Sequence, residues 1–172
     1  MPGMNALNCV GQNDLVSLRI ICTMARNREY NVEELDKYGN TALLKACYLG
    51  RLECARTLLE FGANIYAVNY FGQNALTLAT YSGNCPLVRE LLQRRSYKDF
   101  NLSSLIPASC VAAMQSHVDI EEYFMKVDSS GEHDQTVHGL GVYDLHEMVE
   151  KAKKIDQQMQ SSQPTFIHHR FR

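Results

Sequence analysis

The stretch DKYGNTALLKACYLGRLECARTLLEFGANIYAVN, residues 36–69, sets the pattern for most of this chain. Glycines fall in it at Gly39, Gly50 and Gly62, with apolar residues packed between them. The stretch FGQNALTLATYSGNCPLVRELL, residues 71–92, has the same layout shifted by 33 positions. A fixed period of this length is typical of repeat proteins, in which similar units stack on one another.

Several residues recur at this period, which supports the assignment of a repeat. The matching pairs are Gly39 and Gly72, Ala46 and Ala79, Gly50 and Gly83, Leu58 and Leu91, and Leu59 and Leu92. A further step reaches residues 107–125, a degenerate copy, and residues 5–22 align as an earlier copy if four extra residues follow them. We therefore predict a repeat domain over residues 1–127, with units near 4–36, 37–69, 70–102 and 103–127.

Each unit is predicted to form two short helices and a turn, so the fold class is all-α. In the second unit the helices should cover about 41–49 and 52–61, each ended by a glycine, because glycine readily adopts the left-handed conformation of a helix C-terminus. Asn13 replaces this glycine in the first unit and Ser116 in the last, and asparagine tolerates a positive φ better than serine. Such a unit cannot bury both faces alone, so stability must come from stacking.

Composition narrows the class of protein. The net charge of −2 and a pI near 6.3 provide no general basic field, which argues against a nucleic-acid or membrane-surface partner. No apolar run approaches the roughly 18 residues of a membrane-spanning helix, and a secretory signal pattern is absent. We expect an intracellular protein, cytoplasmic or nuclear.

Neither cysteines nor histidines point to a metal, a cofactor or catalysis. The six cysteines lack a C-x-x-C pair and are predicted to be reduced thiols of the core: Cys9, Cys22, Cys47, Cys54, Cys85 and Cys110. His133 and His138 are five residues apart, which fits no ligand pair on one helix face, and they are expected to be solvated. With no nucleophile or phosphate-loop motif either, we predict no metal, no cofactor and no enzymatic activity.

The residues YGNTALLKACYLGRLECARTLLEFGAN and FGQNALTLATYSGNCPLVRELL resemble the ankyrin repeat family, over about residues 4–126. The resemblance lies in the period, the glycines and the paired leucines. It implies an ankyrin-like solenoid of about four helix-turn-helix units. It also implies a protein-binding scaffold, whose hairpin tips and first helices line a continuous concave surface.

The repeated positions of the glycines, which we call the glycine frame, select the candidate partner-binding residues. They are the two residues before each hairpin glycine, the residue after it, and the two residues before each helix-ending glycine: Lys37, Tyr38, Asn40, Tyr48 and Leu49, then Tyr70, Phe71, Gln73, Tyr81 and Ser82. Five of these ten are aromatic, against 9% of the whole chain. Aromatic side chains are enriched at binding hot spots, so we predict a groove that receives an extended peptide or a loop of a partner.

Two alternatives to this groove stay open. Single rings, such as those of Phe71 or Tyr48, are instead explained by packing under a hairpin or between units. A narrower version of the groove is an aromatic cage around a methylated lysine or an arginine.

The C-terminal part has a different character. Residues 128–141 are rich in glycine, serine and polar residues and are predicted to be a linker. Residues 142–160 are predicted to form an amphipathic helix with one apolar stripe: Leu145, Met148, Val149, Ala152, Ile155 and Met159. This helix either folds back over the last unit or pairs with a helix of another chain or of a second copy. The tail, 161–172, is expected to be disordered, a docking peptide, or the point where a longer protein was cut.

A basic cluster of Arg94, Arg95 and Lys98 is placed at the end of the third unit's second helix. Cations there complement the helix dipole, and the rival interpretation is a docking patch for an acidic partner. Taken together, the sequence predicts a non-catalytic adaptor or regulatory protein that binds another protein. The alternative is a structural module that self-associates through its C-terminal helix.

Overall fold

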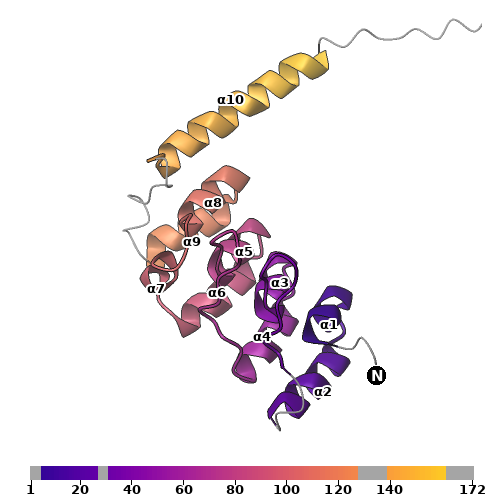
Figure 1. The fold of residues 1–172 in the computed structure, drawn as a ribbon. Helices are drawn as coiled ribbons and strands as arrows, with labels where there is room; N and C mark the ends of the chain where they lie inside the picture. Colours follow the sequence, from indigo (N-terminus) through magenta and orange to yellow (C-terminus); the bar gives the residue numbers. More distant parts are fainter. Residues whose placement is uncertain (1–4, 27–30, 128–138, 162–172) are drawn as a thin grey trace, which may run out of the picture.

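Helices form the regular structure of this chain (Figure 1). The computed structural model describes residues 5–26, 31–127 and 139–161. In these ranges there is no β-strand, and isolated bridges such as the antiparallel one between Val68 and Asn74 are too short to count as strands, so the all-α prediction is confirmed. The helices are α1 (Ala6–Gln12), α2 (Leu15–Arg26), α3 (Ala42–Tyr48), α4 (Leu52–Glu60), α5 (Ala75–Tyr81), α6 (Cys85–Arg94), α7 (Tyr97–Asn101), α8 (Ala108–Gln115), α9 (Val118–Val127) and α10 (Val142–Ser161).

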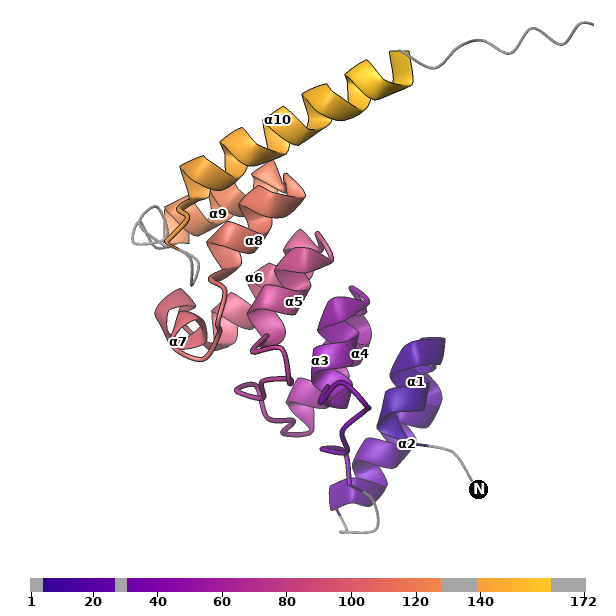
Figure 2. The same cartoon turned by 45° about the horizontal axis from the view of Figure 1, so that its top comes forward.

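Helix pairs stack side by side in two rows (Figure 2). The pairs are α1 with α2, α3 with α4, α5 with α6, and α8 with α9. The first helices form one row, in which α1 packs on α3, α3 on α5 and α5 on α8. The second helices form the other row, in which α2 packs on α4, α4 on α6 and α6 on α9. This arrangement is a solenoid, because each pair contacts its neighbours in the stack.

The first helices of the middle units, α3 and α5, are short and almost continuously buried because neighbours surround them. In α5, six consecutive residues from Ala75 to Thr80 are buried. Ala46 and Ala79, which match across the repeat, are both fully buried, and their small side chains let adjacent helices approach closely. Helices α3 and α5 start at side-chain caps: Thr41 Oγ1 accepts from the Leu44 N–H, and Asn74 Oδ1 accepts from the Thr77 N–H.

Left-handed residues end the first helices, as the glycine frame predicts. Gly50 and Gly83 have φ values of 65° and 69°. Asn13 and Ser116, the two replacements, adopt φ values of 57° and 59° and close α1 and α8. The last unit therefore keeps the backbone turn of the others although serine tolerates this conformation less well.

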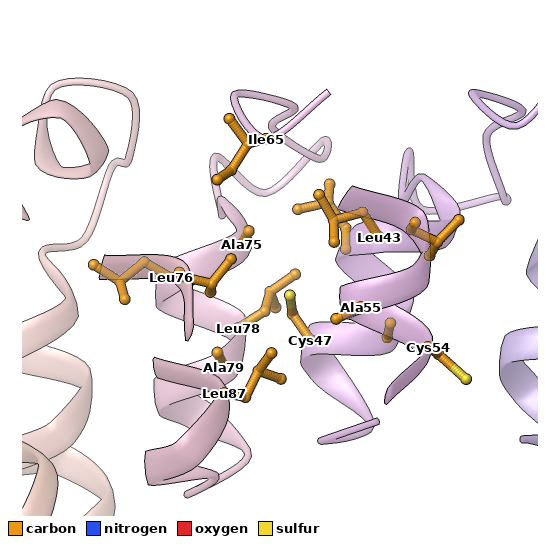
Figure 3. Packing of buried hydrophobic residues seen from close by; sticks show 14 of the residues in the cluster. Leu43, Cys47, Cys54, Ala55, Ile65, Ala75, Leu76, Leu78, Ala79 and Leu87 are labelled. Carbon is orange, nitrogen blue, oxygen red and sulfur yellow. The ribbon is translucent and has the colours of Figure 1, made fainter. Parts of the chain in front are cut away.

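One hydrophobic core runs through the four helix pairs, and Figure 3 shows it between α3, α4, α5 and α6. Five of the six cysteines are buried, and Cys85 is partly exposed. Burial raises the pKa of the Cys47 thiol to about 12. Burial, with a smaller contribution from Cys9, raises the pKa of Cys22 to about 11. These thiols are protonated and unreactive at neutral pH, which fits packing as their role.

A short helix that the repeat frame does not predict, α7, lies between the third and fourth pairs. Ser96 Oγ accepts from the Asp99 N–H and caps it, while Tyr97 and Phe100 are buried. The Tyr97 ring lies 5.0 Å from that of Phe124, and its hydroxyl accepts from the Ser109 N–H. Because α7 packs against the last pair, it joins the third and fourth units.

The extra helix also corrects the placement of the basic cluster. Helix α6 ends at Arg94, Arg95 is its extended C-cap, and Lys98 lies on α7. The three cations are therefore not on one helix end, because the backbone leaves the helical conformation at Arg95.

Helix α10 lies across the end of the stack with its first half packed on α8. Val142 and Leu145 pack against Cys110 and Ala113 of α8. Its second half runs beyond the stack (Figures 1 and 2), and residues 150–159 are all exposed. Most of the predicted linker, including His133 and His138, and the tail from residue 162 lie outside the described residues. No helix of the described part is long and apolar enough to cross a membrane.

Candidate functional site

Two hairpin loops form one side of the candidate site. In the first loop, Asp36 Oδ1 accepts from the backbone N–H groups of Tyr38 and Asn40. In the second loop, Asn69 Oδ1 accepts from those of Phe71 and Gln73. Asp36 and Asn69 are 33 positions apart, so the same turn is built twice. Each loop presents its aromatic residue from a fixed backbone rather than from a loose connection.

The hairpin glycines are required by close packing as well as by backbone conformation. Gly39 has a φ of 78°, and a Cβ added to it would lie 2.6 Å from Cδ1 of Tyr70. The Tyr70 ring therefore rests on Gly39, and its backbone N–H donates to the carbonyl of Tyr38 at 3.1 Å. Gly72 is covered in the same way by the side chain of Leu105. Each hairpin tip is held by the following one.

A polar network connects the two loops beneath the rings. Asn69 Nδ2 donates to Asn40 Oδ1 at 2.9 Å and to Gln73 Oε1 at 3.0 Å. Asn40 Nδ2 donates to Asp36 Oδ2 at 3.0 Å. A carboxylate only accepts, so Asp36 fixes the direction of the Asn40 amide, which then offers its oxygen to Asn69. Burial opposes ionisation of Asp36, but the hydrogen bonds from Asn40 and Tyr38 outweigh it and lower the pKa of this carboxyl group.

Exposed aromatic rings pair across the two middle units. Tyr48 and Tyr81, at the ends of α3 and α5, stack with centroids 5.7 Å apart and planes inclined by 15°. Tyr38 and Phe71, at the hairpin tips, are 6.2 Å apart and tilted by 40°. Phe71 is 61% exposed and Tyr48 50%, so neither ring is sealed under a hairpin or between units. Both rings thus contact a ring of the neighbouring unit, as the packing alternative expects, while half or more of each residue stays exposed.

A pocket of about 270 Å³ lies between the hairpins and the first helices. Its lining consists of Tyr38, Asn40, Tyr48, Asn69, Phe71, Gln73 and Leu78. We call this pocket, with the Tyr81 ring stacked beside it, the aromatic groove. The structure brings five of the ten candidate residues into its lining. Asn69 and Leu78 were missed by the sequence analysis, although Asn69 shares the repeat position of Asp36.

The other candidate residues lie around the aromatic groove. Lys37 places its ammonium 4.8 Å from the centroid of the Tyr38 ring. Tyr70 is 72% exposed and covers Gly39. Leu49 is the partly exposed C-cap of α3, and Ser82 Oγ donates to the carbonyl of Ala79. None of these four belongs to the pocket lining.

The row of exposed side chains at the ends of the first helices continues into the fourth helix pair, through residues that the sequence analysis did not select. Met114 holds the position 33 residues after Tyr81 and is exposed to the same extent. The His117 ring covers Gly83, and its Nε2 is 3.4 Å from the carbonyl oxygen of Tyr81. The repeat frame, extended by one more step, would have found Met114.

A second pocket, of about 320 Å³, is lined by Leu59, Ala63, Ile65, Arg94 and Arg95. Arg94 pairs with Glu90 at 2.9 Å, and the Arg95 guanidinium lies 5.3 Å from the centroid of the Tyr66 ring. Both cations therefore have partners within the chain. Across the described ranges, no three histidine, cysteine or acidic side chains are grouped to hold a metal ion.

Comparison with known proteins agrees with this geometry. Residues 4–104 match the family model for ankyrin repeats, described as three copies. The chain belongs to the ankyrin repeat family. Its α8–α9 pair lies beyond the matched residues, yet it packs on the stack as a fourth helix pair.

Relatives of this ankyrin repeat chain differ in how far they match it. It is 64% identical to the DNA replication inhibitor plutonium of Drosophila melanogaster over 174 aligned positions, which cover all of both chains. It is 37% identical to the Notch-regulated ankyrin repeat-containing protein of Xenopus tropicalis over 41% of this chain and 62% of that one. It is 38% identical to the ankyrin repeat domain-containing protein 13B of Mus musculus over 42% of this chain and 12% of that one. Ankyrin repeats mediate protein–protein interactions, and the full-length relative is named as a DNA replication inhibitor.

Proposed function

We propose that this chain is a non-catalytic, intracellular regulatory protein that binds another protein in the aromatic groove and thereby restrains DNA replication. The replication role is carried over from the name of the Drosophila relative, which is similar along its whole length. The groove is suggested by one observation: a pocket of about 270 Å³ ringed by exposed aromatic side chains on a hydrogen-bonded frame.

The lining of the pocket favours an extended partner segment with one large anchoring side chain. Three rings supply apolar contact area, and because two of them stand on hydrogen-bonded loops, little entropy is lost on binding. Asn40, Asn69 and Gln73 supply amide groups that fit a peptide backbone. An aromatic or long aliphatic anchor would fill this space.

The cage for a methylated lysine or arginine is less well supported than a neutral anchor. The Lys37 ammonium already lies over the Tyr38 ring at the rim of the pocket, so a cation from a partner would compete with it for this ring. The pocket lining itself holds amides and rings but no carboxylate to balance a buried cation.

The test is nucleotide incorporation in a replication-competent embryo extract to which the purified chain is added. The wild-type chain should lower incorporation, and the Tyr48→Ala/Tyr81→Ala variant should lose most of this effect. Tyr143→Ala removes an exposed tyrosine from α10, outside the aromatic groove, and should behave as wild type. Circular dichroism checks that both variants keep their helices.

Two outcomes would contradict different parts of the proposal. No effect of the wild-type chain on incorporation would contradict the replication role. Equal inhibition by the wild type and by the double variant would contradict the aromatic groove.

A further inference from the structure

The second half of α10 carries an apolar row that faces solvent. Met148, Ala152, Ile155 and Met159 continue from Leu145 with alternating spacings of three and four residues. Met148 is 55% exposed, Ile155 56% and Met159 66%. This spacing is that of the a and d positions of a coiled coil, with Leu145, Ala152 and Met159 at a, and Met148 and Ile155 at d. We call these five positions the α10 seam.

Apart from Leu145, which belongs to both, the contacts that fix α10 to the stack use a different face of the helix. Leu145 and Val142 pack on α8, His146 Nε2 lies 2.7 Å from Oε2 of the buried Glu121, and Lys153 Nζ donates to Ser116 Oγ. At 3.6 residues per turn, this face lies about 100° around the helix from the exposed part of the α10 seam. The stack therefore leaves the seam open over its last three positions, from Ala152 to Met159.

We propose that the α10 seam binds the α10 seam of a second copy of this chain, with the two helices parallel. Charge pattern decides the partner and the direction. Lys151 precedes Ala152, at a g position, and Asp156 follows Ile155, at an e position. In a parallel pair, each g side chain lies beside the e side chain of the next heptad on the other helix. Lys151 of each copy then meets Asp156 of the other.

An antiparallel pair would leave these charges without opposite partners. In the register that places Ala152 opposite Ile155, Lys151 would face Gln158 and Asp156 would face Val149. In the single chain Lys151 forms an ion pair with Glu147 at 2.7 Å, with both side chains 68% exposed. Such an exposed ion pair contributes little to stability, so Lys151 can exchange it for a contact with the second copy.

The bodies of the two copies do not obstruct this pairing. Because the stack lies about 100° from the seam, a two-fold axis along the seam places the two stacks on opposite sides of the helix pair. Because Leu145 is already packed on α8, only the seam from Met148 to Met159 contributes, so the interface is small and the dimer should be weak and concentration-dependent. It would present two aromatic grooves in one assembly.

Sedimentation equilibrium of the whole chain over a concentration series tests this inference. The wild type should be a monomer–dimer mixture. Ile155→Glu should raise the dimer Kd by about 100-fold or more, because it places two unpaired carboxylates in the seam. Tyr143→Glu introduces the same charge on the opposite side of α10 and should leave Kd unchanged.

A charge exchange tests the parallel direction. Lys151→Glu and Asp156→Lys should each weaken the dimer by roughly fivefold through like-charge contacts. The double variant should recover the wild-type Kd. A chain that stays monomeric at every concentration, or a dimer that Ile155→Glu leaves intact, overturns the proposal. A double variant no tighter than the single ones overturns the parallel pairing.

Discussion

The two middle units and the C-terminal end are built from similar helix pairs that have different neighbours. Helices α3 and α5 each lie between two first helices, whereas α8 has α5 on one side and the single helix α10 on the other. The middle hairpins are locked to each other through Gly39, Tyr70 and the Asn40–Asn69 hydrogen bond. At the end, residues 150–159 of α10 are all exposed. Stacking thus fixes aromatic side chains in the middle and leaves an apolar helix face open at the end.

The largest effect should come from the core of the middle units. Leu76→Ala on α5 removes a fully buried side chain with neighbours on all sides and should lower the free energy of unfolding by about 3 kcal/mol. Leu145→Ala, at the α8–α10 contact, should cost only about 1 kcal/mol, because α10 can detach while the stack stays folded. Urea denaturation followed by circular dichroism measures both. Equal losses would contradict the difference between the two regions.

The hairpin glycines should show the next largest effect. Gly39→Ala places a Cβ at a φ of 78° and against the Tyr70 ring, so the loss should be about 2 to 3 kcal/mol. Gly62→Ala is the matched control, since its φ is 87° but no atom lies within 4 Å of the added Cβ. It should cost about 1 kcal/mol. Thermal unfolding of the two variants compares them, and a similar cost for both would argue against the packing of Tyr70 on Gly39.

A smaller effect is expected for the polar network of the loops. Asp36→Asn should cost about 1 kcal/mol at neutral pH, because the Asn40 amide loses an acceptor or turns away from Asn69. The pKa of Asp36 is lowered in the folded chain from the usual 3.8. Its contribution is therefore present above that value and is lost as pH falls through the folded pKa. Acid denaturation should be less steep in the variant, and an unchanged acid profile would contradict this role.

The last effect is a pH dependence of stability that should appear only at high pH. The Cys47 thiol has its pKa raised from 9.0 to about 12, so the unfolded chain releases this proton first. Its contribution to stability is complete below pH 9.0 and falls as pH rises towards 12. Cys47→Ala should therefore reduce the pH dependence of the unfolding free energy in that range. Parallel curves for the two chains would contradict the buried, protonated thiol.

The sequence predicted the parts of the fold that depend on local chemistry and period. Gly50 and Gly83 mark helix ends because few other residues adopt their backbone conformation. The period of 33 then places equivalent residues without further information. Helix α7 was missed because Tyr97 and Phe100 gain their stability from Phe124 and other residues distant in sequence, not from the repeat frame.

The sequence predicted which positions belong to the candidate site, but not which of their side chains line the pocket. The frame selected Tyr38, Tyr48 and Phe71 because equivalent positions share one side of the stack. It did not distinguish the lining from the rim, since that depends on side-chain directions and on the network between loops. The apolar stripe predicted for α10 has two different environments in the structure, because Leu145 is buried on α8 while Ile155 is exposed.

The central claim, that the aromatic groove is the binding surface, is tested most directly by site-specific photo-crosslinking in the replication-competent extract. A photoreactive aromatic residue is placed at Phe71, and in a matched chain at Tyr143 on α10. We predict one discrete protein adduct from position 71 that is absent from position 143 and that the Tyr48→Ala/Tyr81→Ala variant loses. The same adduct from both positions, or none from position 71, would contradict the account.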